Sequence, residues 1–396
     1  MAKNRRVALI GVGETVFKTD VSDKTYVELS QDAAKAALDD AGLGPDDIDA
    51  VVFSMAPTQF VGVNDVDKWA VDSVWAAGKP FMRVHTGGAT GGSALHAGYA
   101  HVASGMYRTV LVVGADRVTE TPDAQLVLNL IWDLFYEHDF ALNTVTMTAL
   151  STQRYMHKYG TTEEQYARVV VRSRHNALNN PYAHLKGDIT IDNVMSSPRI
   201  SWPYKLFDIC PRSAGAAAVV LANEEVTKRH CSHPAFINGI GGLASTVFMG
   251  DRVGPYADAE LSDEAEFVVA GKEAYAQAGI TNPIKEIQVV ELYDAFSSMQ
   301  FPQLESLGFC KRGQAQELSD EGAFDMGALL SVNPSGGTLC TNPIGVTGLV
   351  RVADAALQVM GKAGEAQVSG VRNALATAVG GSVQFVNCTI LGADYV

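Results

Sequence analysis

Two segments of this chain, one in each half, carry the same order of residue types. Residues 36–52 hold a helical stretch that stops at Gly42, then a short loop and an aliphatic run that closes on Val-Val. Residues 273–290 repeat this order, with Gly279 at the helix end. Because glycine is the usual C-cap of a helix and β-branched runs are typical of buried strands, both segments predict the same helix, loop and strand. The fold must therefore accommodate an internal repeat.

A second pair of segments strengthens the case for duplication. Gly88-Ala-Thr-Gly91 and Gly345-Val-Thr-Gly348 each indicate a helix start, and the two pairs follow in the same order at offsets of roughly 240 and 257 residues. Strands separated by helices are typical of α/β folds with helix-covered sheets. We therefore expect an α/β protein with two duplicated halves. Its further strands are predicted over residues 7–11, 109–114, 214–221, 235–240, 374–379 and 384–391.

The repeat divides the chain into an N-terminal half, residues 1–230, and a C-terminal half, residues 231–396. Residues from about 119 to 205 interrupt the first half and are richer in Tyr, His, Arg and Asn. An insertion of about 80 residues in a compact α/β half is commonly a lid or a ligand-covering loop domain. A helical cap or a dimer contact is the alternative that the sequence leaves open.

Composition limits the classes of function. The chain has 396 residues, a formal net charge of −14 and five widely spaced cysteines. An acidic chain lacks the basic face that nucleic-acid binding needs, and these cysteines show neither metal-ligand spacing nor a disulfide framework. No apolar signal segment opens the chain, and no run approaches the roughly 20 apolar residues of a membrane helix. We expect a cytoplasmic protein with no nucleic-acid partner, no metal and no membrane span.

Four short motifs carry a resemblance to a known family. They lie at residues 81–97, 291–296, 333–348 and 379–382. In this order, on a duplicated α/β chain, they resemble the thiolase superfamily, in the branch similar to sterol-carrier thiolases. The resemblance implies a five-layer αβαβα fold, a homodimer, and coenzyme A thioesters as substrates. Relatives of this branch often work with a small protein that combines an OB fold and a zinc ribbon, so such a partner is also expected.

The chain departs from the family pattern at every position of covalent chemistry. Gly88 stands where the acylated cysteine would be, Asn342 replaces the histidine that activates it, and Ala378 takes the place of a second cysteine. Glycine has no side chain to acylate, and an asparagine amide cannot take up a proton near neutral pH. We therefore expect no acyl-enzyme and no covalently bound cofactor, with coenzyme A entering as part of the substrate.

Members of the superfamily that lack the cysteine include aldolases that cleave a β-hydroxyacyl-CoA side chain from a steroid. This chain is similar to them at His85 and Tyr293. The resemblance implies retro-aldol cleavage with Tyr293 as the proton-transfer residue, assisted by His85 or Asp294. Assistance is needed because a free phenol has a pKa of about 10 and is a weak base at neutral pH. Asn342 completes the predicted catalytic set.

The thioester oxygen needs hydrogen-bond donors as negative charge develops on it. We expect these from the glycine-rich turns, and we expect the space left by the missing side chain at Gly88 to hold substrate. The residues predicted to bind the substrate or its oxyanion are Gly88, Gly337, Gly380 and Gly381.

Other interpretations stay open at this point. A thiolase or acyl-CoA acyltransferase with rearranged catalytic residues would perform Claisen-type chemistry, and a non-catalytic subunit would only bind acyl-CoA or lipid. Asp294 could instead be the N-cap of a helix that begins near Phe296. Cys340 lies close to the predicted site, but a lone free cysteine is most often a small buried hydrophobe.

Overall fold

Ten strands of the computed structural model form one hydrogen-bonded sheet, five from each half of the chain. The structure describes residues 6–133, 135–137, 139–140, 142–249, 251 and 260–396. The N-terminal strands are β1 (Val7–Glu14), β2 (Ala50–Ser54), β3 (Phe81–Val84), β4 (Thr109–Arg117) and β7 (Ala214–Asn223). The C-terminal strands are β8 (Ala235–Ala244), β9 (Val289–Glu291), β10 (Ser331–Val332), β11 (Asn373–Gly380) and β12 (Phe385–Gly392).

The duplication is visible in the strand order. The sheet runs β10-β9-β11-β12-β8-β1-β7-β4-β2-β3, so each half has its own five strands in the same relative order. The pairing types also match, because β2 is parallel to β3 and β4 while β9 is parallel to β10 and β11. The halves meet where β1 and β8 pair over two residues. The expected repeat is confirmed, and the predicted strands lie in observed ones, except that β12 starts one residue later.

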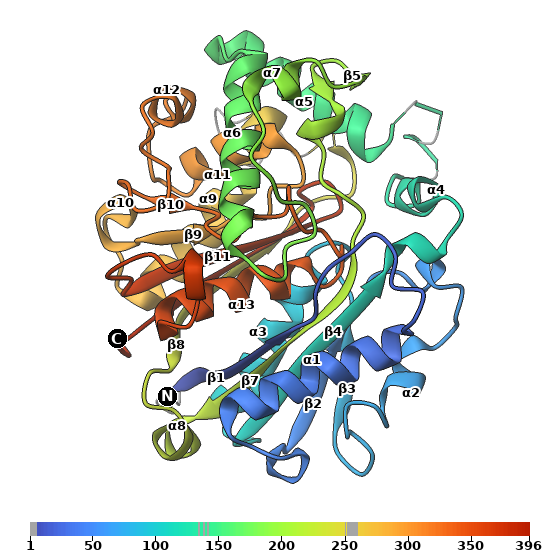
Figure 1. The fold of residues 1–396 in the computed structure, drawn as a ribbon, viewed down its shortest axis with the longest axis vertical. Coiled ribbons are helices and arrows are strands. Elements are labelled where there is room, and N and C mark those ends of the chain that lie inside the picture. Colours follow the sequence, from blue (N-terminus) through green and yellow to red (C-terminus); the bar gives the residue numbers. More distant parts are fainter. Residues whose placement is uncertain (1–5, 134, 138, 141, 250, 252–259) are drawn as a thin grey trace.

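Four helices complete the layers. They are α1 (Tyr26–Ala41), α3 (Thr90–Ala103), α9 (Glu266–Ala278) and α13 (Thr347–Met360). Helix α1 packs on the N-terminal strands and α9 on the C-terminal ones, whereas α3 and α13 contact each other and strands of both halves. In Figure 1, α13 lies between the two groups of strands. This is the five-layer αβαβα arrangement that the sequence led us to expect.

Glycines fix the ends and the crossing of these helices. Gly42 and Gly279 end α1 and α9 with φ of 63° and 67°, a left-handed conformation that glycine adopts at little cost. At the crossing of α3 and α13, a Cβ at Gly91 would lie 2.3 Å from the Leu349 nitrogen, and one at Gly348 would lie 2.8 Å from the Gly92 nitrogen. The repeated Gly-x-Thr-Gly motif therefore exists because two helix starts approach backbone to backbone.

Most of the insertion packs over the C-terminal half, whereas its first helix packs on Phe60 of the N-terminal half. The elements of the insertion are α4 (Ala124–Asn129), α5 (Thr144–Tyr159), α6 (Glu163–Asn176), α7 (Ile191–Met195), β5 (Arg199–Ser201) and β6 (Tyr204–Lys205). Side-chain caps start its longer helices, with Asn143 before α5 and Thr162 before α6. Helices α5 and α6 lie beside the C-terminal elements in Figure 1, and Tyr155 of α5 donates a 2.6 Å hydrogen bond to Glu305 there. The boundary at residue 230 and the limits of the insertion stay predictions.

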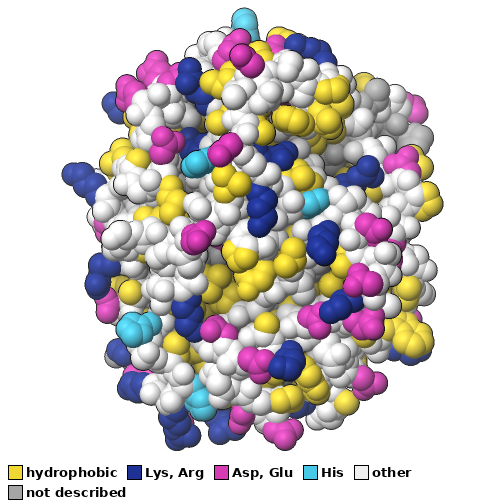
Figure 2. Space-filling model, in the orientation of Figure 1, with side chains coloured by type: hydrophobic (Ala, Val, Ile, Leu, Met, Phe, Trp, Pro, Cys, Tyr) yellow, Lys and Arg dark blue, Asp and Glu magenta, His cyan; other side chains and the backbone are white. Residues whose placement is uncertain are grey.

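Charged side chains are mixed on the surface that Figure 2 shows. Lysine and arginine side chains are scattered among acidic and hydrophobic ones on this face. It therefore presents no continuous basic surface to a phosphate backbone. Within the described part of the chain, no helix has both the length and the apolar character needed to cross a membrane.

Candidate active site

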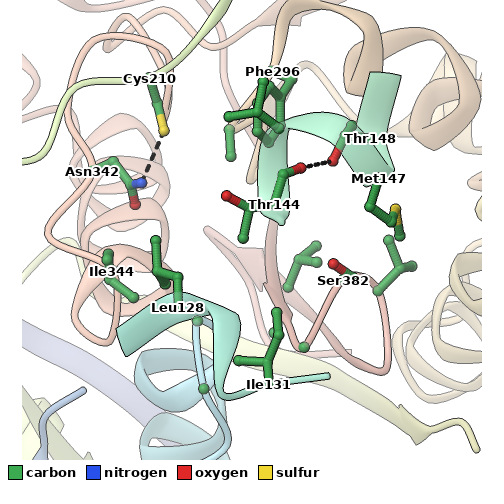
Figure 3. A pocket seen from close by; sticks show the side chains of 18 of the residues that line it. Leu128, Ile131, Thr144, Met147, Thr148, Cys210, Phe296, Asn342, Ile344 and Ser382 are labelled. Carbon is green, nitrogen blue, oxygen red and sulfur yellow. Dashed lines mark hydrogen bonds between the residues drawn. The ribbon is translucent and has the colours of Figure 1, made fainter. Parts of the chain in front are cut away.

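A cavity of about 380 Å³ lies where the insertion meets the motifs of both halves. Its volume falls in the usual range of small-molecule sites. Helices α4 and α5 supply apolar walls, and Figure 3 shows Leu128 beside Ile344 on one side and Met147 on the other. Polar groups reach it from the predicted motifs and from the segment before β7. The predicted site residues that line it are Gly88, Tyr293, Asn342, Gly380 and Gly381.

The space beside Gly88 is filled by protein. A Cβ built on Gly88 would lie 2.5 Å from the Val379 carbonyl oxygen and 2.8 Å from the Tyr293 hydroxyl oxygen. The phenol of Tyr293 therefore lies against the position where a side chain at residue 88 would begin, although Gly88 itself lines the cavity. A side chain at residue 88 would therefore clash with the hydroxyl group of Tyr293 in its observed position. The expected role of Gly88 in substrate binding stays a prediction.

Tyr293 is held from both sides of its backbone. Its N–H donates to Thr377 Oγ1 at 2.8 Å, and its carbonyl accepts from Gln303 Nε2 at 3.0 Å. Its hydroxyl donates to Asn342 Oδ1 at 3.4 Å. Burial raises the pKa of the Tyr293 phenol far above its usual range, and the hydroxyl of Thr347 opposes this only in part. The side chain is therefore a neutral phenol near neutral pH, and its expected role in proton transfer stays a prediction.

Asn342 organises the polar end of the cavity. Its Oδ1 also accepts from Thr347 Oγ1 at 2.8 Å, and its backbone N–H donates to Ser213 Oγ at 3.0 Å. Its Nδ2 donates to the sulfur of Cys210 at 3.0 Å, the contact drawn at one side of Figure 3. Since both amide atoms are engaged, the orientation of Asn342 is fixed toward Tyr293.

Cys210 is a site residue that the sequence did not reveal. It lies 83 residues before Tyr293, but its N–H donates to the Ala295 carbonyl at 2.9 Å, and this bond brings the two segments together. Among the described residues it is the one cysteine that lines the cavity. Burial raises the pKa of its thiol to about 12, so it is protonated near neutral pH and a weak nucleophile.

Two predicted catalytic side chains lie outside this group. His85 is exposed in the turn after β3 and does not line the cavity. Asp294 is fully buried behind Tyr293, where it accepts from the Thr338 N–H at 2.8 Å and from Gln300 Nε2 at 2.7 Å. Burial raises the pKa of Asp294 to about 6. These contacts position the 333–341 turn, so Asp294 does not act directly in the cavity.

Three further expectations are settled by the same region. The N-cap of the short helix at 297–299 is Phe296, without a side-chain hydrogen bond, so Asp294 is not a helix cap. Gly337 does not line the cavity: its N–H donates to Ser335 Oγ at 3.2 Å, and it has a left-handed φ of 69°. Cys340 is fully buried in a small apolar cluster, as expected of a structural cysteine.

The glycine turns bring backbone groups close together at the cavity wall. A Cβ at Gly380 would lie 2.2 Å from the Thr86 carbonyl oxygen and 2.7 Å from the Ala89 nitrogen. The turn before α3 is itself fixed, because Thr90 Oγ1 accepts from the Thr86 N–H at 2.9 Å. Only glycine permits this approach, which places the start of α3 against the end of β11. Helix starts carry partial positive charge and suit a developing oxyanion.

The described residues include no group of three or more His, Cys, Asp or Glu side chains arranged to hold a metal ion.

Comparison with known proteins gives a consistent assignment. Residues 7–195 match the family described as thiolase, N-terminal domain, and residues 257–393 match the family described as thiolase C-terminal domain-like. The chain is 30% identical over 380 residues to an acetyl-CoA acetyltransferase of Methanothermobacter thermautotrophicus, with 96% of this chain and 97% of the relative covered. It is 31% identical over 405 residues to a steroid side-chain-cleaving aldolase of Thermomonospora curvata, with 98% of each covered.

A solved structure agrees with these relatives. The chain superposes on a protein described as an Ltp2-ChsH2(DUF35) aldolase with a TM-score of 0.84 and 30% identity, over 99% of this chain and 98% of that one. The human mitochondrial 3-ketoacyl-CoA thiolase, at 16% identity and a TM-score of 0.74, shares the fold.

Proposed function

Because this chain is an enzyme of the thiolase superfamily, we propose that it cleaves a carbon–carbon bond of a β-hydroxyacyl-CoA by a retro-aldol reaction. One observation carries the proposal: the hydroxyl of Tyr293 fills the position from which a nucleophilic side chain at residue 88 would extend. The superfamily scaffold is kept, and a proton donor has replaced the acyl acceptor. The steroid side-chain-cleaving aldolase among the relatives supports the same class of reaction.

The reaction needs two proton movements and one bond cleavage. The β-hydroxyl loses its proton, the Cα–Cβ bond breaks, and its electron pair moves onto Cα and the thioester oxygen. An aldehyde or ketone leaves, and the enolate of the shortened acyl-CoA takes a proton at Cα. The proton lost by the β-hydroxyl balances the one gained at Cα, so no external acid or oxidant is required.

The side chains suit these steps in different ways. Tyr293, as a neutral phenol, gives the proton to Cα, and the proton that a second group took from the β-hydroxyl then returns to Tyr293. Backbone N–H groups around Gly88 and Gly380 stabilise the oxygen of the enolate. Asn342 holds the phenol through the 3.4 Å hydrogen bond. A phenol with a raised pKa cannot take the first proton, so a second group of the cavity has to face the hydroxyl of the substrate.

Claisen-type acyl transfer is the competing chemistry, and an acetyltransferase among the relatives makes it a real alternative. It would require Cys210 as acyl acceptor, because that is the cysteine of the described chain that lines the cavity. A buried thiol with a pKa of about 12 opposes this role. The geometry therefore favours cleavage without an acyl-enzyme.

The acyl group that fits this cavity is bulky and apolar. Its walls carry Leu128, Ile131, Met147, Phe296 and Ile344. Such a lining gives a hydrocarbon or polycyclic acyl group its affinity through burial of apolar surface. The coenzyme A portion enters as part of the substrate.

A partner protein is the second element of the proposal. Large apolar side chains of the insertion are between 59% and 86% exposed, which is unusual for a free surface. These side chains are Leu126, Leu130, Phe135, Tyr136 and Phe140. The solved aldolase relative is described together with ChsH2(DUF35), which supports a partner protein for this chain. The OB fold and zinc ribbon of that partner, and a homodimeric core, remain what the family resemblance implies.

The test is cleavage of a panel of β-hydroxyacyl-CoA thioesters, with the two products identified by mass spectrometry. We expect the Tyr293→Phe variant to lose at least about 100-fold in kcat, the size of a general acid–base contribution, while it stays folded. Full activity of this variant would refute the role of Tyr293. Cleavage that appears only after a DUF35 protein is added would support the partner.

A further inference from the structure

Glu264 is a buried carboxyl group in the cavity that the steps above do not use. Its side chain lines the same cavity as Tyr293, and the residue is 7% exposed. Its Oε2 atom has no hydrogen-bond partner within the described part of the chain. A buried carboxyl oxygen without a donor is costly, and such atoms in native proteins commonly await a ligand or water.

The segment around Glu264 is fixed, so this orientation is built into the fold. The residue follows a short helical turn at Leu261–Asp263, which α5 holds in place. Ser151 Oγ of α5 donates to the Leu261 carbonyl at 3.3 Å, and Lys158 Nζ lies 3.1 Å from Asp263 Oδ2. Glu264 itself has φ 45° and ψ 47°, a left-handed conformation that is rare for residues other than glycine, asparagine and aspartate. Strained positions of this kind cluster at ligand sites.

No lysine, arginine or histidine among the described residues forms an ion pair with this carboxyl group. Burial raises the pKa of the Glu264 side chain to about 8, the nearby Glu266 adds to the rise, and a hydrogen bond from Gln303 opposes it. Near neutral pH the group therefore exchanges between its acid and carboxylate forms, and in both forms it has an oxygen that can accept a hydrogen bond.

Glu264 lies beside α5 in the wall of the cavity. The helical turn before it, Leu261–Asp263, contacts α5, and Leu261 packs with the apolar cluster of Met147. Figure 3 shows Met147 on the side of the cavity away from Cys210 and Asn342. The lining of the cavity therefore offers an acyl group the carboxyl group of Glu264 as well as the side chains of Tyr293 and Asn342.

We propose that Glu264 accepts a hydrogen bond from a hydroxyl group of the acyl chain and thereby selects hydroxylated acyl-CoA substrates. This rests on the proposed function in one respect, namely that the cavity holds the acyl part of a CoA thioester. The hydroxyl has two possible sources, the β-hydroxyl that the retro-aldol step consumes or a second hydroxyl further along the chain. Both present the same O–H donor to the same carboxyl.

The inference is tested by binding, so that it does not depend on turnover. The probes are dodecanoyl-CoA and the four hydroxydodecanoyl-CoA isomers with the hydroxyl at carbon 3, 6, 9 or 12. Their binding is measured by isothermal titration calorimetry. The 3-hydroxy isomer is titrated into Tyr293→Phe protein, in which cleavage is blocked. The dissociation constants are compared for the unaltered protein, Glu264→Gln and Glu264→Leu. Glu260→Gln is the control, because Glu260 pairs with Lys158 and Arg154 and does not line the cavity.

We expect at least one hydroxy isomer to bind about tenfold or more tightly than dodecanoyl-CoA, as a charge-assisted hydrogen bond allows. Glu264→Leu abolishes this preference, Glu264→Gln reduces it, and Glu260→Gln leaves it unchanged. The carbon that carries the preferred hydroxyl identifies the source. Equal affinity for all five probes in protein that retains Glu264 overturns the inference. A preference for a hydroxylated probe that survives in Glu264→Leu also overturns the inference, as does an equal loss of affinity for every probe in that variant. Absence of cleavage with this preference intact would refute the retro-aldol reaction alone.

Discussion

Restoring the missing cysteine tests the steric link between residues 88 and 293. In Gly88→Cys the new Cβ meets the Val379 carbonyl oxygen at 2.5 Å and the Tyr293 hydroxyl oxygen at 2.8 Å. Both distances are shorter than real Cβ contacts, and one of the two atoms belongs to the backbone and cannot rotate away. Overpacking of this kind costs about 1–3 kcal/mol, and with two contacts we expect the upper end, about 3 kcal/mol.

The expected shift in thermal stability follows from chain length. Unfolding entropy of about 2.1 cal/mol/K per residue amounts to about 0.8 kcal/mol/K for this chain, so about 3 kcal/mol lowers the melting temperature by about 4 °C. Differential scanning calorimetry resolves a change of that size. Gly44→Ala is the matched control, since a Cβ there would have its nearest neighbour at 3.7 Å, and we expect a change within about 0.5 kcal/mol.

A double-mutant cycle separates the two contacts. Tyr293→Phe removes the hydroxyl oxygen and leaves the ring carbon, Cζ, 3.4 Å from the Cβ at residue 88, an ordinary separation. Gly88→Cys should then cost about 1 kcal/mol less in the Tyr293→Phe background than in the unaltered protein. If the two substitutions are additive, or if Gly88→Cys costs nothing, Tyr293 does not fill the position of the lost side chain.

Three further predictions concern other groups. Burial lowers the pKa of His96 to about 4, so the unfolded state binds a proton more readily than the folded state between pH 6.5 and 4. The free energy of unfolding should therefore fall by about 3 kcal/mol as the pH drops from 6.5 to 4, with no loss from His96 above pH 6.5. In denaturant titrations, His96→Gln should reduce this dependence on pH. Asp294→Ala leaves the Thr338 N–H and Gln300 without their acceptor and should cost about 2–3 kcal/mol, measured the same way. Cys210→Ser should keep activity within about fivefold, because the thiol is no acyl acceptor, and a loss above 100-fold would contradict this.

Much of the architecture could be predicted because it depends on local chemistry. The C-cap glycines at 42 and 279 and the repeated Gly-x-Thr-Gly motif act through backbone conformation and close approach, which residue type alone reveals. These signals lie within a few residues of one another in the chain. These local signals predicted two duplicated halves, and the structure shows that the halves share one strand order.

The site was less predictable because its members meet only in space. Tyr293 and Asn342 were identified by their motifs, but Cys210 and Glu264 come from segments with no motif of their own. The direction of the Tyr293 pKa shift depends on burial, which a sequence does not state, so the sequence could not show that this phenol is neutral near neutral pH. Asp294 belongs to the same motif as Tyr293, but its carboxyl group accepts hydrogen bonds from Thr338 and Gln300 and does not line the cavity.

The central claim is cleavage without a covalent acyl-enzyme, and one measurement addresses it directly. The protein, with the proposed DUF35 partner supplied, is mixed with a β-hydroxyacyl-CoA that it turns over and is quenched in acid during the steady state. The intact protein and the products are then analysed by mass spectrometry. We predict a shortened acyl-CoA and one equivalent of aldehyde or ketone, with the protein at its unmodified mass. A protein mass increased by an acyl group, removed by hydroxylamine and absent in Cys210→Ser, would contradict the account and assign the chain to thioester acyl transfer.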